Sequence, residues 1–120
     1  MKNYERIFGA IMLLAGATMA LPAHATERAL SANELNAMVS NTEIAFSSRW
    51  VSGVTSYRQD GSARTDLAIG VSDQGKWWLD GNQVCTQWQR LRNGQANCVT
   101  IFQGDGETFR TSNGFIIRAL

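Results

Sequence analysis

Histidine and proline are almost missing from this chain. Its 120 residues contain one of each, His24 and Pro22, and both fall within the first 25 positions. Because no histidine follows, residues 26–120 cannot form a Ser-His-Asp or Cys-His nucleophile system. Zinc sites that use imidazole are excluded as well, and two cysteines alone make a poor structural zinc site. We therefore expect no catalytic residue, no metal ion and no cofactor, and we do not expect an enzyme.

The first 25 residues have the pattern of a secretory signal peptide. Lys2 and Arg6 form a basic start, an apolar run covers 7–21, and Ala23-His24-Ala25 is a small-x-small cleavage pattern. The run is shorter than the ~20 apolar residues that span a bilayer. The sequence therefore predicts cleavage between Ala25 and Thr26, a single domain over 26–120, and a periplasmic or secreted location in a Gram-negative bacterium. Contact with the membrane is expected only through the cleaved leader.

Excess charge of either sign is also missing. The chain has 11 Lys and Arg, 10 Asp and Glu, and a formal net charge of +1. Removal of Lys2, Glu5 and Arg6 with the leader brings the net charge to zero. This balance argues against a nucleic-acid partner, because non-specific binding to phosphates depends on an excess of basic side chains.

The only two cysteines, Cys85 and Cys98, both lie after the leader. An even cysteine count in a small exported domain indicates a disulfide. A tight Asn93-Gly94 hairpin would leave the two sulfurs about 13 Å apart along the strands, which is too far for a bond. Direct pairing therefore requires a wider loop, about Gln89 to Gly94, beneath the bridge.

A short helix is predicted over about 31–40. Ser31 is a suitable N-cap, and Glu34 three residues later completes a capping box. Leu35 is one of several apolar residues at helical spacing, so the helix presents one apolar face. Since about nine residues are marginal alone, the helix must pack on something, and we expect it to close one end of a barrel or lie across it. Residues 26–30 are expected to form a mobile lead-in.

After Asn41 the apolar period changes to two, which predicts strands. Alternating segments occur at 44–50, 54–59, 67–72, 77–80, 84–89, 99–102 and 115–118, with a short one at Phe109. Turn signals separate them at Asp60-Gly61, Asp73-Gln74-Gly75, Asp80-Gly81, Asn93-Gly94, Asp105-Gly106 and Asn113-Gly114. The fold class is therefore mainly β: an antiparallel meander of seven or eight strands that forms a small barrel or a strongly curled sheet.

The segment from Tyr57 to Thr100 resembles a family of small exported Gram-negative proteins classed as a domain of unknown function. The resemblance is carried by Tyr57-Arg58-Gln59-Asp60-Gly61, by the run Gly75-Lys76-Trp77-Trp78-Leu79-Asp80-Gly81-Asn82-Gln83-Val84-Cys85, by Trp88 and by Cys98-Val99-Thr100. It implies export and a small β-rich fold. It implies no reaction, because none is assigned to the family.

Four residues are candidates for binding: Tyr57, Trp78, Arg90 and Arg92. Trp77 and Trp88 share strand faces with apolar neighbours, so we expect them in the core. Trp78 points the other way, which makes it the tryptophan best placed for an exposed contact. Arg90 and Arg92 flank the predicted disulfide loop, where they could bind an anion.

These features favour a non-catalytic binding module whose partner is an envelope protein, a glycan or a small ligand. A first alternative is a periplasmic protease inhibitor that inserts residues 26–30 as an arm, which rests on architectural analogy alone. A second is a hydrolase that uses a pair of carboxylates from Asp60, Asp66, Asp73, Asp80, Asp105 and Glu107. A third is a purely structural envelope component.

Overall fold

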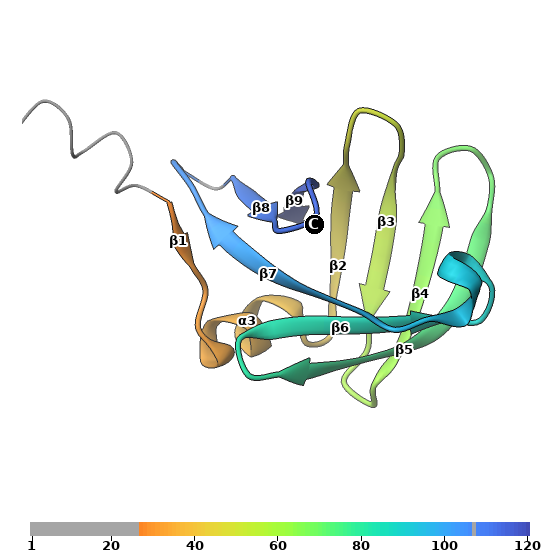
Figure 1. Ribbon diagram of the computed structural model, residues 1–120, viewed down its shortest axis with the longest axis horizontal. Helices are drawn as coiled ribbons and strands as arrows, with labels where there is room; N and C mark the ends of the chain where they lie inside the picture. The colour runs from red at the N-terminus through yellow and green to blue at the C-terminus, as the bar shows by residue number, and fades with distance from the viewer. Residues whose placement is uncertain (1–26, 107) are drawn as a thin grey trace, which may run out of the picture.

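The computed structural model describes residues 27–106 and 108–120. The predicted leader and its cleavage point between Ala25 and Thr26 lie outside these residues, as does Glu107. Eight antiparallel strands follow one another around a closed barrel: β2 (Thr42–Ser47), β3 (Ser52–Tyr57), β4 (Ser62–Leu67), β5 (Ser72–Asp80), β6 (Gln83–Trp88), β7 (Asn97–Gln103), β8 (Phe109–Thr111) and β9 (Ile116–Ala119). Pairing of β9 with β2 closes the ring (Figure 1). The predicted mainly β barrel with one short helix is confirmed.

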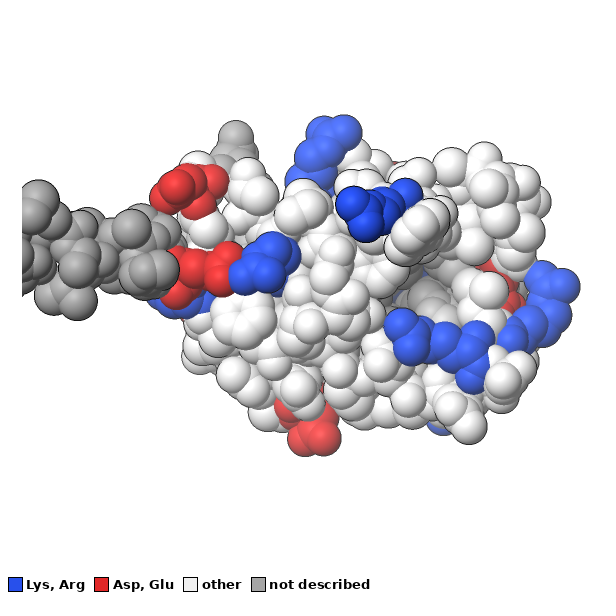
Figure 2. All heavy atoms as spheres, turned by 45° about the horizontal axis from the view of Figure 1, so that its top comes forward, with Lys and Arg blue, Asp and Glu red and all other residues white. Residues whose placement is uncertain are grey.

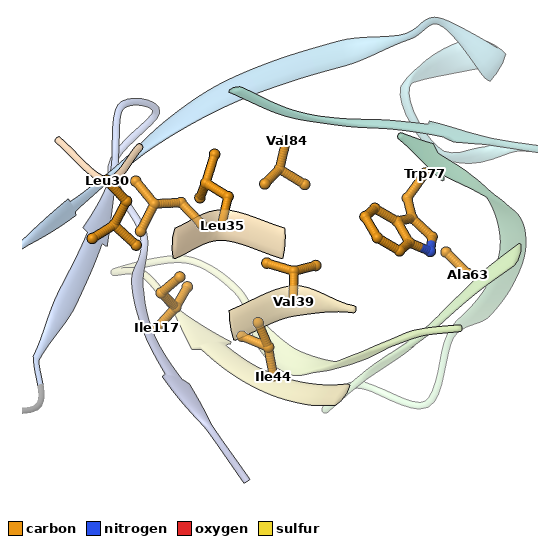
Figure 3. Close-up of a cluster of buried hydrophobic side chains, with 9 residues drawn as sticks. Leu30, Leu35, Val39, Ile44, Ala63, Trp77, Val84 and Ile117 are labelled. Atoms are coloured by element: carbon orange, nitrogen blue, oxygen red, sulfur yellow. The ribbon is translucent and has the colours of Figure 1, made fainter. Parts of the chain in front are cut away.

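The helix α3 (Ala32–Val39) begins as the sequence predicts. Ser31 Oγ accepts a hydrogen bond from the Glu34 backbone N–H at 3.3 Å, and a Glu34 carboxylate oxygen accepts one from the Ser31 N–H at 3.0 Å. Leu35 and Val39 are buried, and α3 contacts β2, β5 and β6. Figure 3 shows the side chains of Leu35 and Val39 among those of the surrounding strands. The helix therefore closes one end of the barrel, as expected.

We expected residues 26–30 to form a mobile lead-in, but residues 28–30 are held against the barrel. The strand β1 (Arg28–Ala29) pairs with the end of β7. Leu30 is buried in the core, and its N–H donates to the Ile101 carbonyl at 2.8 Å. The reason is that β6 pairs only with the first part of β7, which leaves an edge that β1 covers.

One predicted strand and one predicted turn are wrong. The expected strand over 67–72 is a turn at 68–71, closed by a hydrogen bond from the Leu67 N–H to the Val71 carbonyl at 2.7 Å. The expected turn at Asp73-Gln74-Gly75 lies inside β5. Gly75 is needed there for close approach, because a Cβ atom at this position would lie 2.1 Å from the Gln87 carbonyl oxygen.

The two ends of the barrel differ. At the helix end lie α3 and the turns at 58–61 and 81–82. At the opposite end, which we call the open end, lie four loops: 48–51, 68–71, 89–96 and 112–115. The loop 89–96 includes the short 3-10 turn η1 (Leu91–Gly94). Its width agrees with the predicted loop beneath the disulfide, since Cys85 and Cys98 are direct partners in the β6–β7 register.

Candidate functional site: a cavity beneath the open end

A cavity of about 370 Å³ lies inside the barrel, between α3 and the loops of the open end. Val39 of α3 contributes to its floor, and the inward-facing side chains of β2, β3, β4, β6, β7, β8 and β9 form most of its wall. The open-end loops contribute Val51, Leu91, Arg92, Asn113 and Phe115. Figure 2 shows a hollow in the molecular surface with Lys and Arg side chains at its margin.

The cavity wall is mainly apolar and aromatic, with separate polar points. Among its aromatic members, Phe46 and Phe115 meet edge to face at 5.5 Å between ring centroids. Thr55 and Thr65, on neighbouring strands, share a hydrogen bond at 3.0 Å between their hydroxyl oxygens. Polar atoms on an otherwise apolar wall are what fix the orientation of a small ligand.

Tyr57, a predicted binding residue, does line the cavity. Its ring lies edge to face against Trp77, 5.7 Å between centroids. Burial raises the pKa of its hydroxyl to about 12, an effect that a hydrogen bond with Thr55 partly opposes. The hydroxyl therefore stays protonated at physiological pH, so it can both donate and accept a hydrogen bond.

Trp77 and Trp88 occupy the interior of the barrel, as the alternation of their strands predicts. Trp77 is buried, and its indole Nε1–H donates to the Arg58 carbonyl at 2.7 Å. That bond ties β5 to the turn that follows β3. Trp88 is half-buried and lines the cavity. Trp77 therefore stabilises the fold, whereas Trp88 can also contact a ligand in the cavity.

Asp73 fixes the loop that carries the two predicted arginines. Its side chain is almost fully buried, and one carboxylate oxygen accepts the backbone N–H groups of Arg90 and Leu91, both at 2.9 Å. The other oxygen accepts the Gln74 N–H at 2.8 Å. Burial works against ionisation, but these three N–H donors outweigh it, so the pKa of Asp73 lies below its ordinary value.

Arg92 and Arg90 have different surroundings. Arg92 lines the cavity and has a left-handed backbone conformation, φ 56°. The Arg90 side chain is largely exposed, donates to the Ser72 carbonyl at 2.5 Å, and lies 3.8 Å from the Asp73 carboxylate. Of the two predicted anion-binding residues, Arg92 is therefore the one that a ligand in the cavity can reach.

Trp78, the fourth predicted residue, is not part of the cavity. It is half-buried on the outer face of β5, directly opposite Cys85 in the β5–β6 register, with Lys76 Nζ 5.8 Å from its ring centroid. The disulfide between Cys85 and Cys98 lies on the same outer face. The sequence predicted the direction of Trp78 correctly, but the barrel encloses its cavity on the other side of the sheet.

Sequence reasoning missed the exposed apolar residues of the open end. Trp50 is 86% exposed and Ile69 is 77% exposed, while Val71 is exposed at 39%. We assigned all three to alternating strand segments, whereas the structure places them in the loops after β2 and β4. A signal was present: Gly70 lies between Ile69 and Val71, and its backbone has a positive φ of 95°, which glycine adopts without strain.

No Asp or Glu lines this cavity among the residues that the structure describes. Within the same residues, no group of three or more His, Cys, Asp or Glu side chains could hold a metal ion. Over 27–106 and 108–120, no helix is long and apolar enough to cross a membrane. The arrangement is suited to enclosing a small molecule through shape, apolar contact and a few hydrogen bonds.

The fold and the cavity together define a class: an up-and-down β-barrel, closed at one end by a helix, that encloses a cavity. No protein-family model, no curated protein and no solved structure matches this chain. The resemblance to a family of exported proteins stays a prediction.

Proposed function

We propose that this protein is an exported, non-catalytic binding protein that holds a small ligand inside its barrel. The ligand would have an apolar body and an anionic or hydrogen-bond-accepting end. The cavity is the observation that carries this proposal. Its 370 Å³ falls within the range of small-molecule sites, about 300–1,000 Å³. At ~30 Å³ for each group the size of a water molecule, it accommodates about twelve non-hydrogen atoms.

The distribution of polar groups gives the ligand its expected orientation. The cavity lining includes Val39 at the helix end, Phe46 and Val99 on the strands, and Phe115 just before β9, which suit an apolar body. Arg92 comes from an open-end loop, where a guanidinium would pair with a carboxylate or phosphate. A ligand with its charged group toward the open end satisfies both parts of the wall.

The disulfide supports the exported location, because such bonds persist in oxidising compartments.

The two alternative functions have less support. An inhibitor would insert residues 26–30 as a free arm, but Arg28 and Ala29 pair with β7 and Leu30 is buried. For the hydrolase alternative, the acid to consider is Asp73, which holds the loop that carries the cavity residues Leu91 and Arg92. Its pKa is lowered, whereas a general acid needs a raised one.

Direct titration with decanoate, followed by isothermal titration calorimetry, tests the proposal. Decanoate has twelve non-hydrogen atoms, and we expect it to bind saturably to the folded protein. Thr86→Phe fills part of the cavity and should abolish binding. Ser56→Phe makes a similar change on the outer face of β3 and should preserve it.

Arg92 gives the test its specificity. Arg92→Gln should weaken decanoate binding about tenfold, because it removes a charge-assisted hydrogen bond. Binding of 1-decanol, which has no charge, should change little. If Thr86→Phe binds both molecules as well as the unmodified protein does, while its thermal unfolding remains cooperative, the cavity is not the binding site and the proposal fails.

A further inference from the structure

Three exposed apolar residues lie on two loops of the open end of the barrel. We call Trp50, Ile69 and Val71 the apolar rim. Trp50 and Ile69 are more exposed than any other large hydrophobic residue that the structure describes. Exposed tryptophan and isoleucine on neighbouring loops are unusual on a surface that meets only water, and such patches mark interaction sites.

Hydrogen bonds hold the loops of the apolar rim together. The Ala68 N–H donates to the Ser52 carbonyl at 2.9 Å, which joins the loop of Ile69 to the start of β3, directly after the loop of Trp50. The Arg90 guanidinium donates to the Ser72 carbonyl, next to Val71, and so joins the loop 89–96 to the same group. The apolar rim therefore lies on two neighbouring loops beside the cavity, and the loop 89–96 is bonded to the strand that follows the second of them.

The charged residues within the open-end loops all have one sign. The four open-end loops contain Arg49, Arg90 and Arg92 and no Asp or Glu. Arg49 also lies over the Trp50 ring, 5.8 Å from its centroid. The nearest acids are Asp73, which is buried, and Asp66, which forms an ion pair with Arg64 at 3.0 Å. The helix end, in contrast, carries both signs, with Glu34 in α3, Asp60 and Arg58 in the turn 58–61, and Asp80 at the end of β5.

We propose that the open end docks on the surface of an anionic lipid bilayer. Trp50 and Ile69 would enter the interfacial region, where tryptophan is favoured because its ring is apolar and its N–H is polar. Arg49 and Arg90 would face the headgroup phosphates. Loop tips that carry apolar residues and cations fit such a surface without a shape-complementary partner. This inference does not require the cavity to hold a ligand.

Vesicle sedimentation tests the docking with the full barrel. The probe is large unilamellar vesicles of phosphatidylglycerol and phosphatidylcholine in equal amounts, compared with phosphatidylcholine alone. We expect binding to the anionic vesicles, accompanied by a blue shift of tryptophan emission, and at least fivefold weaker binding to the neutral ones. Arg49→Gln should weaken binding about fivefold, because one basic side chain near the surface is lost. Trp50→Ser combined with Ile69→Ser should weaken it further and remove the blue shift.

Two control variants remove the same kinds of side chain, one arginine and one exposed apolar residue, at the other end of the barrel. Arg58→Gln removes an exposed arginine from the turn at 58–61, and Leu120→Ser removes an exposed apolar residue beside the start of β2. Both changes lie at the helix end and should leave vesicle binding unchanged. The proposal is overturned if anionic vesicles bind no protein, or if the controls weaken binding as much as the open-end variants do. Arg92 is left intact in every variant, so failure here is distinguishable from failure of ligand binding.

Discussion

Asp73 shows how one side chain organises the open end of the barrel. Its carboxylate is the only side-chain acceptor for the backbone N–H groups of Arg90 and Leu91 among the hydrogen bonds described here. Leu91 is the first residue of η1, and Arg92 follows it directly. If the carboxylate is lost, the loop loses the contact that fixes its position relative to β5. The geometry of the cavity entrance therefore depends on a residue that the sequence assigned to a turn.

Asp73→Ala should make the loop 89–96 more mobile without unfolding the barrel. The two N–H groups that it leaves without an acceptor should exchange with solvent about tenfold faster or more. Hydrogen exchange followed by NMR at Arg90 and Leu91 measures this directly. Asp80→Ala, at the exposed β5–β6 turn, is the matched control and should leave both amides unchanged. Equal exchange in the two variants would show that Asp73 does not anchor the loop.

The same carboxylate should make stability depend on pH. The pKa of Asp73 is lower in the folded chain than its ordinary value, so its contribution is complete above that value and disappears as the pH falls through the folded pKa. Glu34 acts in the same direction, because the Arg28 guanidinium and then the Ser31 N–H lower its pKa to about 2. Exposure and salt screening reduce the effect of Glu34.

The melting temperature should therefore fall between about pH 4.5 and pH 2. Thermal unfolding measured at several pH values should show a shallower fall for Asp73→Asn than for the unmodified protein. Parallel curves for the two proteins would rule out Asp73 as a source of the pH dependence.

At the scale of single residues, two of the four candidate binding residues, Tyr57 and Arg92, line the cavity, and their binding role stays a prediction. Trp50 was missed because alternation alone cannot tell the end of a strand from the loop that follows it. Its exposure depends on β2 ending at Ser47, and a hydrogen bond from the Ser48 N–H to the Val51 carbonyl closes the loop there.

Among the elements, α3 was the most predictable because its start is determined locally. Ser31 and Glu34 are three residues apart and satisfy each other's backbone groups without help from the barrel. The position of the helix was predictable only in outline. Its buried face had to meet an apolar surface, but the sequence does not say which strands provide that surface.

Leu35→Ala tests how firmly the helix closes the barrel. Leu35 has no exposed surface, so the substitution should lower the free energy of unfolding by about 3 kcal/mol. Urea-induced unfolding followed by circular dichroism is the measurement. Asn36→Ala, on the exposed side of the helix, should change the free energy of unfolding by less than about 0.5 kcal/mol. A similarly small effect for Leu35→Ala would mean that α3 is not packed into the barrel end.

β4 was mispredicted because it lines a cavity. Its inward positions are Ala63, Thr65 and Leu67, of which only Leu67 is a large apolar residue. A hydrophobic period of two is therefore weak over 62–67. The period is stronger over 67–72, where Ile69 and Val71 are loop residues. In a strand that lines a cavity, small or polar side chains take inward positions where a filled core would have large apolar ones. The alternation of apolar and polar residues that predicts a strand is therefore weaker there.

At the scale of the whole molecule, the disulfide is the one covalent link between strands. Cys85 and Cys98 join β6 to β7 on the outer face and close a loop of about 14 residues. The Cys85→Ser, Cys98→Ser double variant should lose about 3 kcal/mol of stability, because the unfolded chain regains the entropy of the open loop.

Urea unfolding with and without dithiothreitol measures this contribution. The reductant should lower the stability of the unmodified protein to that of the double variant and leave the variant unchanged. Unfolding of both proteins at the same urea concentration in the absence of reductant would contradict the structural role.

Closure of the barrel could be expected from the sequence, but the cavity could not. Turn residues at regular spacing predict a meander, and a meander hides its edges by closing. Whether the interior is filled depends on the volumes of side chains that meet from distant strands, such as Thr86 of β6 and Phe115 before β9. Which side chains face one another depends on the register between strands. The register is set by the hydrophobic pattern together with the geometry of the turns.

The central claim is that a small ligand binds inside this barrel, and amide chemical shifts measured during a decanoate titration test it most directly. We predict saturable shifts at cavity-lining residues such as Thr86, Asn97 and Val99, and little change at the outward-facing Ser56 and Arg64. Shifts confined to the outer face, or no saturable shifts up to millimolar decanoate, would contradict the claim.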